Sequence, residues 1–139
     1  MRRLLLASHG PLARAMKETL ELLTGPDDRI TSLCAYVGED SMDVALLIDS
    51  WEHGCKPDDD WLVVTDILGG SVNNEFLIRM GRMPFHLIAG MNLPLLVELV
   101  TCSNSADDDS LADVVHRANG SITICSAPSA AIDNEDDDF

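Results

Sequence analysis

RRLLLASHGP, residues 2–11, is the stretch of sequence that decides how this chain folds. The short apolar run from Leu4 to Ala7 predicts a buried strand. The run ends at Ser8-His9-Gly10, and Pro11 follows at a position that suits the first turn of a helix. Apolar residues then recur at helical spacing as far as Leu23, which predicts a helix with one buried face. His9 therefore stands at a strand-to-helix turn, at the carboxyl end of the first strand.

Beyond this stretch, strand and helix patterns alternate along the chain. Further strands are predicted at residues 30–36, 61–66, 85–89 and 121–125, with helical patterns between them. The run WLVVTD at residues 61–66 is apolar almost throughout, as in a strand that is buried on both faces of a parallel sheet. We therefore expect an α/β fold with a doubly wound, mostly parallel sheet of four strands, followed by one C-terminal strand. Residues 1–125 form a single domain in this interpretation, and residues 126–139 form an acidic tail that we expect to be disordered.

The charge of the chain narrows its possible partners. A formal net charge of -15 at pH 7 argues against nucleic acid or an anionic membrane surface. Much of this charge lies in acidic runs that are typical of solvated loops and tails. One run, Asp58 to Asp60, resembles part of a calcium loop, but it lacks the glycine and the distal glutamate of an EF-hand. We therefore expect no metal site.

Cysteine usage and the N-terminal residues indicate the compartment. The four cysteines, Cys34, Cys55, Cys102 and Cys125, form no C-x-x-C pair and no zinc-ligand spacing, which favours reduced thiols. Arg2-Arg3 precedes an apolar run that is too short for a signal peptide. No apolar stretch reaches the length of a membrane span. We therefore expect a cytoplasmic protein that does not insert into a membrane.

Three strand-to-helix junctions carry polar and small residues. They are Ser8-His9-Gly10, Thr65-Asp66 with Gly69-Gly70-Ser71, and Gly90 to Pro94. Connections in a parallel α/β sheet are right-handed, so all three junctions are expected at one edge of the sheet, where such sheets bind ligands. A strand ending at Asp66 that lies beside the first strand would bring the Asp66 carboxylate next to His9.

This group of residues suggests phosphoryl chemistry. A carboxylate that accepts a hydrogen bond from one imidazole nitrogen leaves the lone pair of the other nitrogen free as a nucleophile. The glycines permit a close approach of the backbone, while Ser71 is expected to cap the next helix and offers a hydroxyl. No Walker pattern and no G-x-G-x-x-G is present, so neither a bound nucleotide nor another cofactor is expected. The candidate catalytic residues are His9 and Asp66, and the candidate phosphate-binding residues are Gly10, Gly69, Gly70 and Ser71.

Three ordered motifs resemble one known protein family. They are SHG at residues 8–10, VTDILGGS at residues 64–71 and GMNLPLLVE at residues 90–98. With these motifs, residues 2–125 resemble the IIA component of the mannose family (mannose, fructose, sorbose and N-acetylgalactosamine type) of the bacterial phosphoenolpyruvate:sugar phosphotransferase system. The sequence departs from the usual pattern at Val72, where a proline commonly follows Gly-Gly-Ser.

The resemblance implies a place in a phosphoryl relay. His9, with Asp66 as the partner of its ring, would accept a phosphoryl group from the phosphocarrier protein HPr and pass it to a histidine-bearing IIB component. The linker to a fused IIB domain is reduced at most to APSAA at residues 127–131, so a separate IIB chain is expected. The resemblance also implies a homodimer in which the last strand, residues 120–125, crosses to the sheet of the other subunit. The sugar is not specified by this chain.

Other functions that use the same site remain open from the sequence. A phosphocarrier subunit of a dihydroxyacetone kinase resembles this fold and uses the same histidine chemistry, although the NLP stretch at residues 92–94 favours the sugar system. A regulatory module whose phosphorylation is read without onward transfer would have an identical acceptor site. A hydrolase with a phosphohistidine intermediate should surround the phosphate with several arginines and a second histidine. Here no arginine directly precedes His9, and only Arg14, about one turn along the predicted helix, could approach it.

Overall fold

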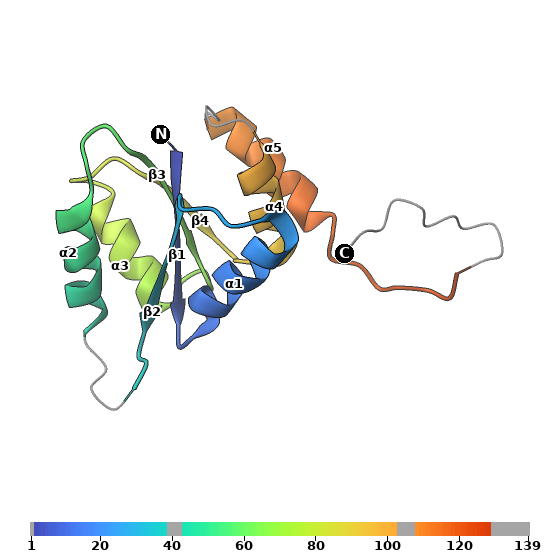
Figure 1. The fold of residues 1–139 in the computed structure, drawn as a ribbon, viewed down its shortest axis with the longest axis horizontal. Helices are drawn as coiled ribbons and strands as arrows, with labels where there is room; N and C mark the ends of the chain where they lie inside the picture. The colour runs from blue at the N-terminus through green and yellow to red at the C-terminus, as the bar shows by residue number, and fades with distance from the viewer. Residues whose placement is uncertain (1, 39–42, 103–107, 129–139) are drawn as a thin grey trace.

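A parallel sheet of four strands lies at the centre of the computed structural model, which describes residues 2–38, 43–102 and 108–128 (Figure 1). The strands are β1 (Arg2–His9), β2 (Ile30–Ala35), β3 (Asp60–Thr65) and β4 (His86–Ala89). Their order across the sheet is β2-β1-β3-β4, so the connections turn in opposite directions on either side of the β1–β3 pair. The expected α/β class with a doubly wound sheet of four parallel strands is confirmed.

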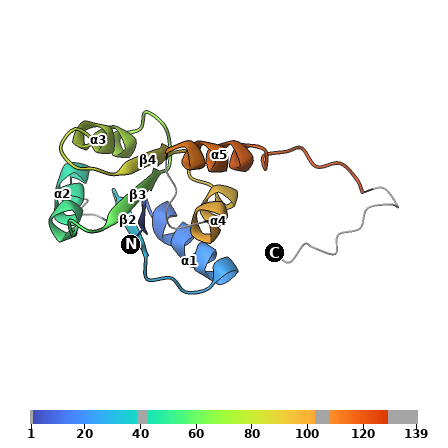
Figure 2. The same ribbon diagram turned by 90° about the horizontal axis from the view of Figure 1, so that it is seen from above.

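Five helices cover the two faces of this sheet. One face carries α1 (Leu12–Thr24) and α4 (Leu93–Thr101), with α5 (Asp108–Asn119) packed beside α4, and the other face carries α2 (Val44–Gly54) and α3 (Ser71–Arg79) (Figure 2). Among the described residues, no helix is long and apolar enough to cross a bilayer.

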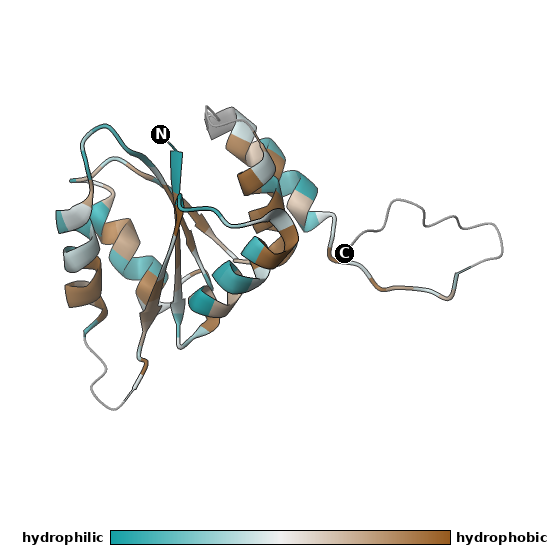
Figure 3. Cartoon of the chain, in the orientation of Figure 1, coloured by the Kyte–Doolittle hydropathy of each residue, from teal (hydrophilic) through white to brown (hydrophobic). Residues whose placement is uncertain are grey.

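The strand side chains alternate between the two faces and build a core on each. In β1, for example, Leu4 and Leu6 pack on the side of α1 and α4, whereas Leu5 and Ala7 pack on the side of α2 and α3. The apolar colouring of the strands, and of the helix surfaces that face them, shows both cores in Figure 3. This burial on two faces explains why the middle of β1, residues 4–7, and the middle of β3, residues 61–64, are continuously apolar in the sequence.

Helix starts differ in how they are capped. The Asp43 side chain accepts a hydrogen bond from the Ala45 amide at the start of α2, and the Asn92 side chain accepts one from the Leu95 amide at the start of α4. In α3 the capping residue is Gly70, and no side chain caps the helix. The prediction that Ser71 caps α3 is therefore wrong, because Ser71 is the first residue of the helix.

The segment that follows α5 is not a strand in this single chain. Residues 122–128 are irregular and run away from the domain (Figures 1 and 2), and Ile122 and Ile124 are 75% and 97% exposed. A strand needs a hydrogen-bonding neighbour, and no described strand lies beside this segment, so the strand predicted at residues 121–125 does not form within one chain. Its crossing to a second subunit stays a prediction. Most of the predicted tail, residues 129–139, lies outside the described residues.

Candidate active site

The carboxyl ends of β1 and β3 bring His9 and Asp66 into contact. Ala7 lies opposite Thr65 in the sheet, so the two candidate residues follow at the same edge. Asp66 Oδ2 accepts hydrogen bonds from the His9 backbone amide and from His9 Nδ1, each at 2.7 Å, and Asp66 Oδ1 accepts one from the Ile67 amide at 2.9 Å. The Asp66 side chain is only 11% exposed. The structure thus joins the two residues that the sequence nominated as catalytic.

The state of the Asp66 carboxyl decides which nitrogen of His9 carries a proton. Burial would by itself raise the pKa of Asp66, but the hydrogen bonds from the His9 backbone and ring and from the Ile67 backbone outweigh it and hold this pKa below its ordinary value. The carboxylate is therefore ionised at neutral pH and can only accept hydrogen bonds. Nδ1 must carry the proton that it shares with Asp66, so in the neutral form of the ring Nε2 has a free lone pair.

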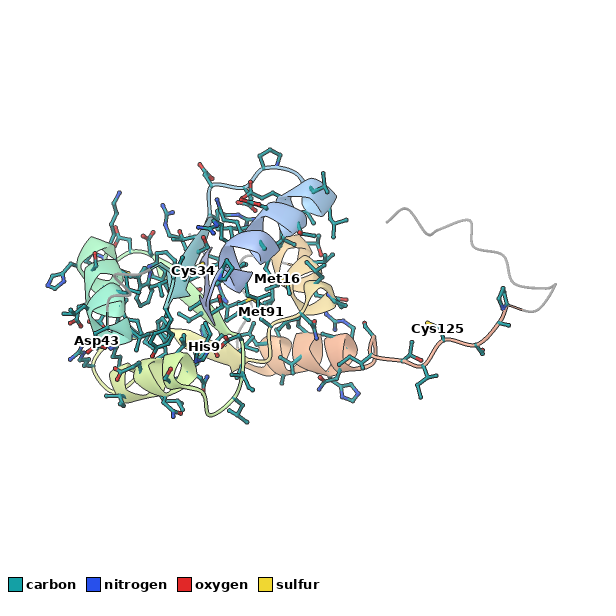
Figure 4. The ribbon with its side chains drawn as sticks, turned by 90° about the horizontal axis from the view of Figure 1, so that it is seen from below. His9, Met16, Cys34, Asp43, Met91 and Cys125 are labelled. Carbon is teal, nitrogen blue, oxygen red and sulfur yellow. The ribbon has the colours of Figure 1, made fainter. Side chains whose placement is uncertain are left out.

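The Nε2 side of the ring faces the start of α3. Ser71 Oγ lies 3.1 Å from His9 Nε2, and in the neutral form of the ring the serine hydroxyl donates to this nitrogen. The His9 side chain is 40% exposed, so this side of the imidazole is open to an incoming partner. Figure 4 shows His9 at the edge of the sheet, next to the ribbon of α3. One ring nitrogen is thus fixed by a buried carboxylate, and the other is half-open to solvent.

Two positions in the turn between β3 and α3 require glycine for steric reasons. Gly69 has a φ of 80°, a left-handed conformation that few residues other than glycine adopt. A Cβ atom on Gly70 would lie 3.0 Å from His9 Cε1 and 2.8 Å from Ile67 Cγ2, so any side chain there would press on the imidazole. The loop therefore approaches the ring as closely as a backbone can.

Several amides that the sequence nominated as phosphate donors already have acceptors. The Gly10 amide donates to the Ala35 carbonyl oxygen at 2.7 Å, and the Gly70 amide donates to the Ile67 carbonyl oxygen at 3.2 Å. The Gly69 amide makes a long contact of 3.4 Å with an Asn73 side-chain oxygen. The candidate donors to an anion are the Ser71 hydroxyl, once it turns away from Nε2, and the first amides of α3, for which a helix provides no acceptor.

Buried polar contacts hold the loops at the carboxyl ends of the strands. Asn73, which is 1% exposed, donates from its side-chain amide to Thr65 Oγ1 at 2.9 Å and so fixes α3 to the end of β3. The third junction contributes in a similar way, because the Gly90 and Met91 amides both donate to the Thr65 carbonyl oxygen at 3.0 Å. These residues hold the loops around the site in place.

Tyr36 is the residue of the site that the sequence analysis missed. Its hydroxyl lies 3.0 Å from Ser71 Oγ, and its ring stacks on the imidazole of His9 with centroids 5.6 Å apart and planes 25° apart. Its position in the sequence could have identified it: Tyr36 directly follows β2, which pairs with β1, so it lies at the carboxyl end of a strand next to that of His9. The sequence analysis treated it only as the last residue of a strand.

The site forms no ion pair with an arginine or lysine side chain among the described residues. None of their ion pairs brings an arginine or lysine to His9 or Asp66, and no group of three histidine, cysteine, aspartate or glutamate side chains among them is arranged to hold a metal ion. The chemistry that this arrangement supports is nucleophilic attack by a neutral imidazole, assisted by a carboxylate and by uncharged hydrogen-bond donors.

Comparison with known proteins gives a match over most of the chain. The sequence pattern of the EIIA-man family, described as PTS system fructose IIA component, matches residues 3–118. A search of curated proteins finds no match.

Solved structures with the same fold add relatives to this match. A Klebsiella pneumoniae protein described as a phosphoenolpyruvate-dependent sugar phosphotransferase system permease is 34% identical, with a TM-score of 0.82 over 89% of this chain and 90% of that chain. The mannose/sorbose-specific IIA subunit of Enterococcus faecalis is 25% identical, with a TM-score of 0.72 over 92% and 97% of the two chains. A IIA protein associated with the fucose utilization operon of Streptococcus pneumoniae is 28% identical, with a TM-score of 0.69 over 88% and 92%.

Proposed function

We propose that this chain, which belongs to the mannose-type EIIA-man family of IIA components of the phosphoenolpyruvate:sugar phosphotransferase system, carries a phosphoryl group on His9. In this proposal the donor is phospho-HPr and the acceptor is a histidine of a separate IIB component. The sugar is a mannose-class sugar, selected by components other than this chain. The protein would act in the cytoplasm, where HPr and IIB meet it.

The observation that carries the proposal is that the two ring nitrogens of His9 have different partners: Nδ1 contacts the Asp66 carboxylate, and Nε2 contacts the Ser71 hydroxyl. The ionised Asp66 carboxylate holds the proton on Nδ1 at 2.7 Å, so the lone pair of Nε2 is available on the exposed side of the ring. Such an arrangement raises the nucleophilicity of Nε2 and fixes its direction without any bound cofactor.

Phosphoryl transfer to His9 requires no loss of a proton from its ring. The Nε2 lone pair forms a bond to phosphorus as the P–N bond of the donor histidine breaks, and the electrons of that bond return to the donor ring. The phosphorylated ring keeps its Nδ1 proton and gains positive character, which the Asp66 carboxylate stabilises. Onward transfer to IIB reverses these roles, with His9 as the leaving group.

Neutral donors suit a group that must leave again. The Ser71 hydroxyl lies 3.1 Å from Nε2, and the first amides of α3 begin at the same residue, so both are uncharged donors that could contact a phosphoryl group on this nitrogen. The glycines at 10, 69 and 70 shape the approach to the ring in this proposal, more than they donate to the phosphate. A ring of arginines would hold the phosphoryl group more tightly and so hinder its transfer, and the described part of the chain offers none at His9.

Exposed apolar side chains next to the site suit docking of a carrier protein. Leu12, Ile67 and Leu68 lie in the first turn of α1 and in the loop after Asp66, and they are 41%, 59% and 76% exposed. Apolar groups that flank a reactive nitrogen are typical of a surface that another protein covers for a short time. This surface supports transfer between proteins over reaction with a small molecule.

The dimer implied by the family is also part of the proposal. β4 pairs only with β3 among the described strands, and a groove of about 640 Å³ between β4 and α5 lies along its other edge, lined in part by Phe85, His86 and Leu111. The exposed Ile122 and Ile124 of a second copy would bury their side chains there by adding a strand to β4. Light scattering after size exclusion should give a dimer for the full chain and a monomer for Ile124→Asp; a monomeric wild type would contradict this part.

Intact-mass measurement with enzyme I, HPr and phosphoenolpyruvate tests the relay. One acid-labile phosphoryl group should appear on the wild-type chain and none on His9→Ala, because Nε2 of His9 is the proposed acceptor. A labelled His9→Ala would contradict the site. Release of inorganic phosphate without a labelled chain would instead favour the hydrolase, and no label with phosphorylated HPr in the same tube would point to another donor.

A further inference from the structure

Tyr36 has a backbone conformation that is unusual for a residue with a side chain. A residue with positive φ follows each strand of the sheet: Gly10 after β1, Tyr36 after β2, Gly69 after β3 and Gly90 after β4. Tyr36, with a φ of 60°, is the one among the described residues that is not glycine. A bulky L-residue adopts this left-handed conformation only at a cost in free energy, and such strain is concentrated at functional sites.

Burial does not explain why a tyrosine is kept at this position. The side chain is 46% exposed, so it contributes little to either core. What the left-handed turn achieves is to direct the side chain over the active site, where the ring stacks on the imidazole of His9 and the hydroxyl reaches Ser71 Oγ at 3.0 Å. The strain therefore serves two contacts that both involve the site.

The protonation state of His9 sets the direction of the hydrogen bonds. In the neutral form of His9, Nε2 has no proton, so the Ser71 hydroxyl donates to it and the Ser71 oxygen is left to accept from the Tyr36 hydroxyl. The three groups form one chain that runs from Tyr36 through Ser71 to Nε2. With its oxygen engaged by Tyr36, the Ser71 hydroxyl keeps its hydrogen directed into the site.

We propose that Tyr36 is a positioning residue, which holds the Ser71 hydroxyl and the imidazole of His9 in the orientation that phosphoryl transfer needs. The inference rests on the proposed function of His9 and extends it. Before transfer the Ser71 hydrogen points at Nε2; once phosphorus is bonded to Nε2, the same hydrogen turns to a phosphoryl oxygen. The tyrosine ring limits rotation of the imidazole on one face, so that Nε2 stays aligned with the incoming phosphorus.

Four variants separate the hydroxyl from the ring. Tyr36→Phe removes only the hydroxyl, whereas Tyr36→Asn removes the ring and keeps a residue that tolerates a left-handed backbone. Ser71→Ala and the double variant Tyr36→Phe/Ser71→Ala complete a double-mutant cycle. Leu22→Ala is the control, because Leu22 is an apolar side chain of α1 that is 83% exposed.

Two phosphoryl donors distinguish positioning from docking. Phospho-HPr reports transfer between proteins, and phosphoramidate, a small donor that phosphorylates imidazole directly, has no docking surface to lose. Tyr36→Phe should slow labelling of His9 by about 3- to 10-fold with both donors, as expected for one lost hydrogen bond. The double variant should be no slower than Ser71→Ala alone, and Tyr36→Asn should be slower than Tyr36→Phe, with a melting temperature within about 2 °C of the wild type.

Each contrary result identifies what is wrong. Unchanged labelling of Tyr36→Phe, or losses that multiply in the double variant, would show that Tyr36 does not act through Ser71. A loss seen only with phospho-HPr would make Tyr36 a docking contact and overturn the positioning role. If phosphoramidate labelling depends on Tyr36 as expected while phospho-HPr labels nothing, the relay fails and the positioning role stands.

Discussion

The two ends of the same sheet use their charged residues in different ways. At the amino end, Arg2 Nε lies 2.8 Å from Asp60 Oδ2 and Arg3 Nε lies 3.0 Å from Asp59 Oδ2, so each cation faces an anion across neighbouring strands. At the carboxyl end, Asp66 faces the neutral ring of His9 in place of a cation.

This difference shows how a strand pair can be stable at one end and reactive at the other. At the amino end each of these two arginines lies beside a carboxylate of opposite charge. At the carboxyl end the carboxylate satisfies only one nitrogen of His9, and the second nitrogen meets Ser71, a hydroxyl that can turn away. The left-handed residues that follow all four strands lie at this end as well. The strained backbone of Tyr36 and the incompletely paired ring of His9 therefore lie at the same end of the sheet.

Replacing a carboxylate by an amide at each end gives the sharpest contrast. Asp66→Asn should slow phosphorylation of His9 by about 10- to 100-fold, because a hydrogen bond to a charged group is lost and the Nδ1 proton is no longer held by an anion. Asp59→Asn, the matched change at the amino end, should leave the rate unchanged and lower the free energy of unfolding by only about 1 kcal/mol. Quenched-flow labelling with phospho-HPr measures the rates. Equal rates for the two variants would remove the distinction between the ends.

The close approach of Gly70 to His9 provides the next test. Gly70→Ala introduces a Cβ atom 3.0 Å from His9 Cε1, so the ring must shift, and labelling should slow by about 10-fold. Gly81→Ala is the control, since a Cβ atom at Gly81 meets nothing within 4 Å. A Gly70→Ala protein that is labelled at the normal rate would mean that the position of the imidazole is not critical.

The low pKa of Asp66 predicts a small effect of pH on stability. Because this pKa is lower in the folded protein than in the unfolded chain, the ionised Asp66 stabilises the fold above about pH 4, and the contribution is lost as the pH falls through the folded-state value. Urea denaturation should therefore show a difference between wild type and Asp66→Asn at pH 7 that shrinks in acid. A difference that grows as the pH falls would show that the pKa of Asp66 is raised in the folded state.

Much of the fold was predictable because its signals are local or periodic. The apolar middles of β1 and β3 are buried on both faces of a parallel sheet, so neither face of these segments carries a charged side chain. The pairing of His9 with Asp66 followed from the rule that parallel strands end at one edge. These predictions need only the order of the elements.

What the sequence could not give depends on conformation in three dimensions. The role of Ser71 was misjudged as a cap because the identity of a residue at a helix start does not say where its hydroxyl points. Tyr36 was missed because no sequence pattern marks a tyrosine that adopts a left-handed backbone, and its contacts with His9 and Ser71 arise only from that turn. The predicted last strand needs a neighbour that one chain does not supply.

The most direct test of the account is to determine which nitrogen of His9 carries the phosphoryl group. NMR of the phosphorylated, ¹⁵N-labelled protein resolves this through the coupling between ¹⁵N and ³¹P. The account predicts a phosphorus bonded to Nε2, with a proton still on Nδ1. A phosphorus bonded to Nδ1, or to any residue other than His9, would contradict it.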